Sequence, residues 1–226
     1  MKPIGWLAGV GSVLVLMACG GGGSAQSSGG VAEPAVPVRI SGVVARGAAL
    51  VEAKVLARCG SGPLVSATSG SSGAYTLEVE ASALPCVLQA VSADGIWTLH
   101  SVARGSADTL AVTAHITTLT ELLVAQLAGT APSVFMAQAT ARTLGATVTP
   151  ANIAKAQVSV AGVLQRMGVN PAPISDVLGQ PLVAASAVQR GNAHDKVLDA
   201  LAESMRSSGA KLADLIALVG SRARTL

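Results

Sequence analysis

The chain has 226 residues, of which 50% are hydrophobic, 12% are charged and only 2% are aromatic, and its formal net charge at pH 7 is +3. The basic residues are scattered singly, so the chain shows neither the basic footprint of a nucleic-acid-binding protein nor a polybasic membrane patch. The scarcity of aromatic side chains argues against a stacking platform for sugars or single-stranded nucleic acid, whereas the abundant Ala, Val and Leu predict a folded chain with an aliphatic core.

Residues 1–18 have the layout of a secretory signal. Lys2 supplies the positive start, and an uncharged apolar run follows it. The run is too short for a membrane-spanning helix, which needs about 20 apolar residues. It ends in Leu16-Met17-Ala18-Cys19, which resembles the lipobox of bacterial lipoprotein signal peptides. The resemblance implies cleavage before Cys19 and acylation of Cys19, which would hold the protein at a membrane. A plain secretory signal with an incidental cysteine is the alternative.

Residues 19–35 are expected to connect this anchor to the folded part of the chain. The stretch from Gly20 to Gly30 is rich in Gly and Ser and predicts a flexible tether. Gly20 stands directly after the cysteine, where an Asp tends to retain enterobacterial lipoproteins at the inner membrane. By this resemblance the expected location is the bacterial cell envelope, lipid-anchored at the outer membrane.

Residues 36–113 predict an antiparallel β-sandwich. Short runs with period-two alternation of apolar and polar residues are separated by turn residues. Ser69–Gly73 predicts a hairpin connection, and Asp94-Gly95 predicts a two-residue turn. The expected strands are Val38–Val44, Ala53–Cys59, Leu64–Thr68, Ala74–Val79, Cys86–Val91 and Trp97–Val102.

A family resemblance in this region rests on three segments: Ser41–Val44, Ala53–Val55 and Thr68–Leu77. The last contains Gly73-Ala74-Tyr75-Thr76-Leu77, which matches the "GxYxL" hairpin of the carboxypeptidase regulatory-like, transthyretin-like β-sandwich. The resemblance implies a fold and no activity, because that domain is an accessory to some carboxypeptidases and is not catalytic. Tyr75 is expected to be a half-buried structural aromatic at the hairpin, and a ligand contact is the alternative.

Two cysteines remain once Cys19 is taken as acylated. Cys59 and Cys86 form an even pair in an oxidising compartment, and we expect a disulfide between them. Closing a loop of this length would stabilise a small β-domain by about 3–4 kcal/mol. A metal site or redox pair is the alternative, and it would need closer spacing or histidine partners.

Beyond residue 113 the periodicity becomes helical, and residues 114–226 are expected to form an α-helical region. Thr118 and Glu121 have capping-box spacing at the start of the first helix. The segment Ala114–Leu123 resembles the "NITPLTEL" segment of a group of uncharacterised proteobacterial lipoproteins, and Gly191–Leu201 resembles their C-terminal segment. No activity is implied by that resemblance.

Four more helices and one shorter piece are predicted in this region. Thr149-Pro150 is a start signal with Pro at the first helical position, Asn170–Pro173 breaks the pattern, and Gly209 is a stop signal. The expected helices are Ser133–Leu144, Thr149–Met167, a short one near Ser175–Leu178, Asp195–Ser207 and Lys211–Val219.

Candidate chemical sites are few. The histidines His100, His115 and His194 occur without an HExxH motif or ligand spacing, so no metal or other cofactor is expected. His115 is expected to be a polar cap or a contact between the two regions. Asp195 and Asp199 lie four residues apart on one helix face, Glu203 continues this acidic row, and the row could attract a cation. A solvated helix face or a helix N-terminal charge accounts for Asp195 equally well.

The strand-rich region contains two candidates for covalent chemistry. The segment Gly70–Gly73 lacks the GxSxG spacing of a serine hydrolase and is expected to be a turn. Lys54, the lysine of the β-region, could form an isopeptide crosslink as in related adhesin domains, but those lysines usually lie in the first strand.

The sequence therefore predicts an α+β protein, an antiparallel transthyretin-like sandwich followed by helices. We expect a non-enzymatic binding or structural module of the envelope, with the membrane as a partner through the lipid anchor, an envelope protein or small ligand as an unknown further partner, and no nucleic acid. The alternative is an enzyme or enzyme accessory subunit with dispersed active-site residues, since catalysis gathers titratable groups in a pocket.

Overall fold

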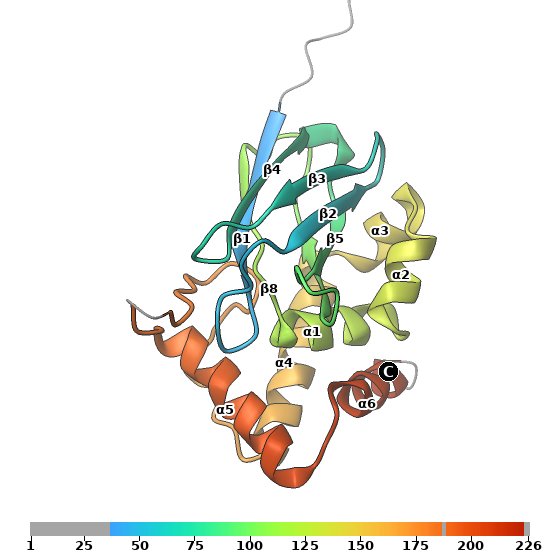
Figure 1. Ribbon diagram of the computed structural model, residues 1–226. Helices are drawn as coiled ribbons and strands as arrows, with labels where there is room; N and C mark the ends of the chain where they lie inside the picture. The colour runs from blue at the N-terminus through green and yellow to red at the C-terminus, as the bar shows by residue number, and fades with distance from the viewer. Residues whose placement is uncertain (1–36, 187–188, 224–226) are drawn as a thin grey trace, which may run out of the picture. The chain divides into compact units, whose positions relative to one another are not determined.

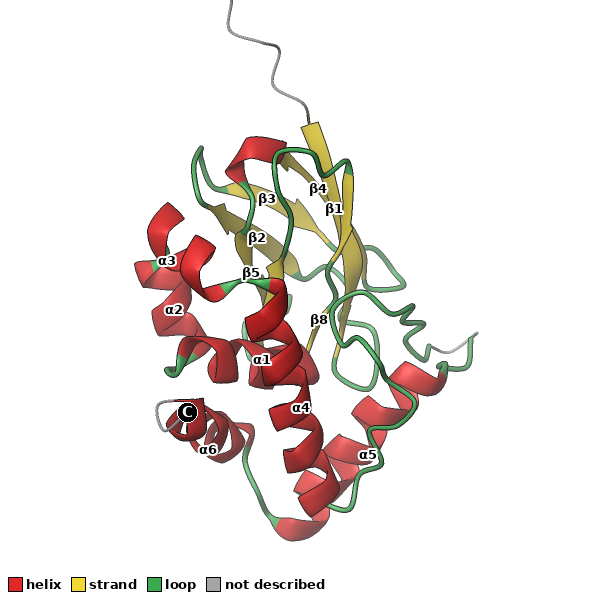
Figure 2. Ribbon diagram, turned by 180° about the vertical axis from the view of Figure 1, so that it is seen from behind, coloured by secondary structure: helices red, strands yellow, loops and turns green. Residues whose placement is uncertain are grey.

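The computed structural model describes residues 37–186 and 189–223 (Figure 1). The described residues belong to one compact unit. Within them, eight strands in two sheets come first in the chain and six α-helices follow. Figure 2 distinguishes the strands, in yellow, from the helices, in red. The α+β class and the order of strands before helices are confirmed.

The first sheet is built around β1 (Pro37–Ala45). One edge of β1 pairs antiparallel with β4 (Ala74–Glu80), and the other pairs parallel with β7 (Ala111–Thr113) and then β8 (Ile116–Thr117). The expectation of a wholly antiparallel arrangement is wrong at this edge. Strands of three and two residues are too short to show a period-two pattern, so β7 and β8 have no sequence signal of their own.

The second sheet consists of β2 (Lys54–Cys59), β3 (Val65–Thr68), β5 (Cys86–Val91) and β6 (Thr98–Ala103), all antiparallel, in the order β3-β2-β5-β6. All six runs predicted from the sequence form strands. The short 3₁₀ helix η1 (Ala81–Ala83) follows β4.

The two sheets bury one aliphatic core, to which β1, β2, β4, β5 and β6 all contribute side chains. Tyr75 belongs to this core with 4% exposure, so the expected half-burial is wrong. Its hydroxyl donates to the carbonyl oxygen of Ala114. Gly42 makes room for this contact, because a β-carbon there would collide with the same carbonyl and lie 3.0 Å from the Tyr75 ring.

Helix α1 (Thr118–Ala128) contacts β6 and the helices α2 (Pro132–Gln138), α4 (Pro150–Arg166) and α6 (Leu212–Ala223). Nine of its eleven residues are buried. Its N-cap lies one residue earlier than the predicted cap, Thr118. Thr117 is the N-cap and Thr120 completes the capping box. Glu121 is bonded instead to His100 of β6: its Oε2 accepts from the backbone N–H at 2.5 Å and lies 2.9 Å from Nδ1.

The predicted helix Ser133–Leu144 is two helices, α2 (Pro132–Gln138) and α3 (Ala141–Thr147). Thr140 interrupts the run because it caps α3 through a capping box of its own with Thr143. A Thr followed three residues later by a second hydroxyl thus begins a helix twice in this chain.

The remaining helices follow the prediction closely. Helix α4 (Pro150–Arg166) is capped by Thr149, α5 (Ala193–Ser208) ends before Gly209 at φ +70°, and α6 (Leu212–Ala223) closes the described chain. The predicted short helix near Ser175–Leu178 is wrong, because these residues form turns. Asp176 holds them in that form by accepting the backbone N–H of Leu178 at 3.0 Å.

Candidate functional site

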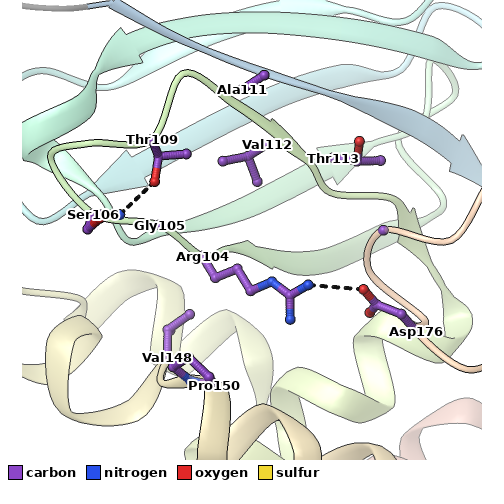
Figure 3. A pocket seen from close by; sticks show the side chains of 11 residues that line it. Arg104, Gly105, Ser106, Thr109, Ala111, Val112, Thr113, Val148, Pro150 and Asp176 are labelled. Atoms are coloured by element: carbon purple, nitrogen blue, oxygen red, sulfur yellow. Dashed lines mark hydrogen bonds and ion pairs between the residues drawn. The ribbon is translucent and has the colours of Figure 1, made fainter.

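A pocket with a volume of about 680 Å³ lies beside β7 (Figure 3). Four segments form it: the loop after β6, β7 itself, the entry to α4, and the turns that precede Gln180. The lining residues are Arg104, Gly105, Ser106, Thr109, Ala111, Val112, Thr113, Val148, Pro150, Asp176 and Gly179.

Arg104 and Asp176 form an ion pair at this pocket. Nη2 of Arg104 lies 3.2 Å from Oδ2 of Asp176, and the Arg104 side chain is 47% exposed. The other carboxylate oxygen, Oδ1, accepts from Gln157 at 3.2 Å and from the backbone N–H of Leu178 at 3.0 Å. Asp176 is therefore fixed by three donors, and it orients a guanidinium whose other N–H groups have no partner among the described residues. In Figure 3 the Arg104 side chain lies between the β7 residues and Val148 with Pro150.

The loop between β6 and β7 is held close to the strands. The backbone N–H of Ser106 donates to Oγ1 of Thr109 at 2.9 Å. A β-carbon at Gly105 would lie 2.5 Å from a methyl carbon of Leu84 and 2.9 Å from Thr109 Oγ1. The glycine lets this loop approach the strand-rich core, which keeps the wall of the pocket in place.

Strand β7 presents an open backbone edge to the pocket. On its inner side Leu110 accepts from the N–H of Arg39 at 3.3 Å, and Ala114 donates to the carbonyl of Ser41 at 2.8 Å. In a parallel ladder with this register, Val112 turns both of its backbone groups toward β1. Ala111 and Thr113 turn theirs the other way, toward the pocket that they line. No described residue forms a hydrogen bond with these four groups.

His115 does not line this pocket and connects β1 to the segment before α5. Its Nδ1 accepts the backbone N–H of Val43 at 3.1 Å, and its Nε2 lies 2.9 Å from the carbonyl oxygen of Gln180. Its ring meets that of His194 edge to face at 5.7 Å. Burial, with a smaller contribution from His194, lowers the pKa of His115 to about 4. The predicted contact between the two regions is confirmed, whereas the predicted cap role is wrong because Thr117 caps α1.

His100 and His194 are also buried and do not line the pocket. His100 lies between Glu121 and Gln89. The Nε2 atom of Gln89 is 3.1 Å from the Nε2 atom of His100. Burial also lowers the pKa of His194. The three histidines thus make buried structural contacts. The described residues contain no group of three or more His, Cys, Asp or Glu side chains that could hold a metal ion.

The acidic row of α5 separates into two environments. Asp195 is 1% exposed and accepts the backbone N–H of Ala185 at 3.0 Å, and burial raises its pKa. Asp195 lies in the first turn of α5, which fits the prediction of a negative charge at the helix N-terminus. The prediction that it lies on a solvated helix face is wrong, because the side chain is buried. Asp199 and Glu203 are exposed, and Glu203 pairs with Arg206 at 2.6 Å.

Of the residues singled out for covalent chemistry, Cys59 and Cys86 form a disulfide between the register-paired positions of β2 and β5. Lys54 is exposed at the start of β2. Cys19, the predicted lipidation site, lies outside the described residues. Among the helices that are described, none alone is long and apolar enough to cross a membrane, and α1 with α2 satisfies that test only as a pair bent by 61°.

The sequence does not predict the pocket. Arg104 and Asp176 are 72 residues apart, and neither lies in a motif. The nearest local signals are the strand run that ends before Arg104 and the proline-rich break before Asp176, and neither indicates that the two meet. No known family model, curated protein or solved structure matches this chain, so its functional interpretation rests on the site just described.

Proposed function

We propose that this protein is a bacterial envelope lipoprotein, anchored through acylated Cys19 at the outer membrane, whose folded part is a non-enzymatic binding module. The lipobox-like Leu16–Cys19 and the Gly/Ser-rich segment after it support the anchor and tether. Two sheets with a common core, and Tyr75 of the "GxYxL" hairpin buried within it, support a transthyretin-like β-sandwich.

One observation carries the binding function: the pocket beside β7. Its volume of about 680 Å³ is in the range of small-molecule and peptide sites, which is roughly 300–1,000 Å³. It combines an oriented guanidinium, the hydroxyls of Ser106, Thr109 and Thr113, and aliphatic walls. A few fixed polar groups among apolar side chains are typical of ligand sites.

The anchor is tested by the substitution Cys19→Ala in intact cells. We expect wild-type protein to incorporate labelled palmitate and to fractionate with membranes, because two or more acyl chains anchor stably. The variant should lose the label and leave the membrane fraction. An unchanged membrane fraction for Cys19→Ala would refute the lipoprotein assignment and leave the binding function to be judged separately.

The binding function is tested by NMR on the folded part, with a library of small acidic, basic and neutral fragments as probes. Binding fragments should shift the amide signals of the residues that line the pocket. Thr113→Trp should fill the pocket and abolish these shifts, whereas Thr76→Trp, an exposed position of β4 outside the pocket, should preserve them. Shifts that avoid the pocket, or that survive Thr113→Trp, would contradict the proposal.

A further inference from the structure

We propose that the pocket binds the carboxyl-terminal end of a peptide chain, which adds as a short parallel strand to the open edge of β7 and places its terminal carboxylate on Arg104. This inference rests on the proposed binding function and names the chemical class of its ligand.

The open edge supplies the backbone recognition. Ala111 and Thr113 each direct an N–H and a C=O into the pocket, two residues apart on one strand. Alternate residues of a strand are about 6.6–7 Å apart, the spacing at which a second strand offers matching groups. Addition of an extended peptide to an exposed sheet edge satisfies such groups and is a recurring mode of peptide recognition.

The edge of β7 is closed at its Thr113 end. Directly beyond β7, the N–H of His115 donates to the carbonyl oxygen of Leu178 at 2.9 Å. A strand that passes Thr113 would therefore meet the turns around Gly179. A chain that terminates at this point avoids the collision, so the geometry favours a chain end over an internal segment.

Charge is placed at the same closed end. Gly179 lies close to both Thr113 and Asp176. A β-carbon built on Gly179 would be 3.8 Å from the carbonyl oxygen of Thr113 and 3.1 Å from Oδ2 of Asp176. That oxygen is the one paired with Arg104. The guanidinium therefore lies near the Thr113 end of the edge, and Arg104 is the one cationic side chain among the described residues that line the pocket.

A terminal carboxylate fits this cation. Guanidinium has five N–H donors, and only the bond to Asp176 occupies one of them among the described contacts. Charge-assisted hydrogen bonds between guanidinium and carboxylate are about twice as strong as neutral ones. A carboxyl end near Thr113, at the C-terminal end of β7, makes the added strand parallel to β7, the same direction in which β7 pairs with β1.

The test begins with a pool of acetylated pentapeptides randomised at their last three positions and bearing a free carboxylate. Affinity selection on the folded protein should enrich a subset, and each enriched peptide is then compared with its C-terminal amide. We expect the amide to bind at least tenfold more weakly, because it loses the charge-assisted hydrogen bond with the guanidinium. Equal binding of acid and amide would overturn the proposal, and so would the absence of any enriched peptide.

Amide hydrogen exchange provides the structural readout. In the free protein the N–H of Val112 should be protected by its bond to β1, while those of Ala111 and Thr113 should exchange quickly. The bound peptide should protect Ala111 and Thr113. An N-methylated peptide that cannot donate from the paired positions should lose this protection and its affinity. Binding without a change at Ala111 and Thr113 would refute strand addition.

Two matched variants separate the parts of the site. Arg104→Gln should bring the acid and amide to the same affinity, whereas Arg39→Gln, an exposed arginine of β1 that also pairs with a carboxylate, should keep their difference. If fragments bind the pocket but no carboxyl-terminal peptide does, the binding function stands and the peptide inference fails. If neither binds, both fail.

Discussion

At the scale of single residues, the contact between Tyr75 and Ala114 connects the two halves of the first sheet. Tyr75 comes from β4, and Ala114 lies between β7 and β8. The strand between them, β1, has Gly42 at the crossing point, where any side chain would collide with the Ala114 carbonyl. Burial raises the pKa of the Tyr75 phenol well above its ordinary value, so the hydroxyl stays a donor across the physiological range.

We predict that Tyr75→Phe lowers the free energy of unfolding by about 1–2 kcal/mol, because it removes the donor to a buried carbonyl while keeping the ring. Gly42→Ala should cost more, since the carbonyl must move to admit the methyl group. Urea unfolding of the two variants beside the wild type measures both effects. A Tyr75→Phe protein as stable as the wild type would show that this hydrogen bond contributes nothing net.

His115 gives the protein a pH-dependent contribution to stability. Its pKa is about 4 in the folded state, below the ordinary value of 6.5. Between these values the unfolded state binds the proton and the folded state does not, so the free energy of unfolding rises with pH. The contribution is complete above about pH 6.5, is lost as pH falls toward 4, and amounts to at most about 3 kcal/mol. Asp195, whose pKa burial raises, contributes with the opposite sign.

The variant His115→Gln isolates this effect, since glutamine can accept the N–H of Val43 and does not titrate. We expect the difference in unfolding free energy between wild type and variant to shrink as pH falls from 7 to 4.5, measured by urea unfolding in half-unit steps. A difference that is the same at every pH would contradict the depressed pKa of His115.

At the scale of elements, the chain uses the same capping box in two settings. Thr120 accepts the N–H of Thr117 at 2.8 Å and donates to the carbonyl of His100 at 2.7 Å, and it is entirely buried. Thr143 accepts the N–H of Thr140 at the same distance, but on an exposed helix end. The first box therefore fixes α1 against β6, whereas the second only begins α3.

We predict that Thr120→Val costs about 2–3 kcal/mol of unfolding free energy, because it leaves a buried N–H and a buried C=O without partners. Thr143→Val is the matched control and should cost less than about 1 kcal/mol, since water replaces the lost bond. Equal losses in chemical denaturation would mean that the contact with His100 adds nothing to the cap.

The elements that the sequence predicted well are those with a repeated local pattern. Six strands with alternating residues and the helices α4, α5 and α6 emerge from periodicity and capping signals. Strands β7 and β8 could not be predicted because their pairing with β1 is a tertiary contact between short segments. The pocket could not be predicted for the same reason. Its open edge depends on β7, and its ion pair joins residues 72 positions apart in the sequence.

At the scale of the whole molecule, the disulfide joins two neighbouring strands of the second sheet. Cys59 and Cys86 are separated by 27 residues, so the bond restricts a loop of moderate length in the unfolded chain. The loop contains β3 and β4, which belong to different sheets. The crosslink thus limits how far the segments that form β3 and β4 can move apart in the unfolded chain.

The double substitution Cys59→Ala with Cys86→Ala should lower the free energy of unfolding by about 3–4 kcal/mol, as loop-closure entropy predicts. Reduced wild-type protein should lose a similar amount. Urea unfolding of the three samples measures the change, and a loss below about 1 kcal/mol would show that the unfolded chain is already compact across this loop.

The position of β1 in the first sheet determines how much of the chain must be synthesised before that sheet is complete. β1 is the first described strand, yet its second edge waits for β7 and β8, which end at Thr117. Until those residues have been made, the nascent chain exposes an unpaired edge, which is a template for pairing with other chains. A fragment that stops at Val102 would contain nearly all of the six strands visible in the sequence and still lack a closed sheet. The smallest autonomous folding unit therefore extends through the start of the helices, and shorter fragments are expected to aggregate.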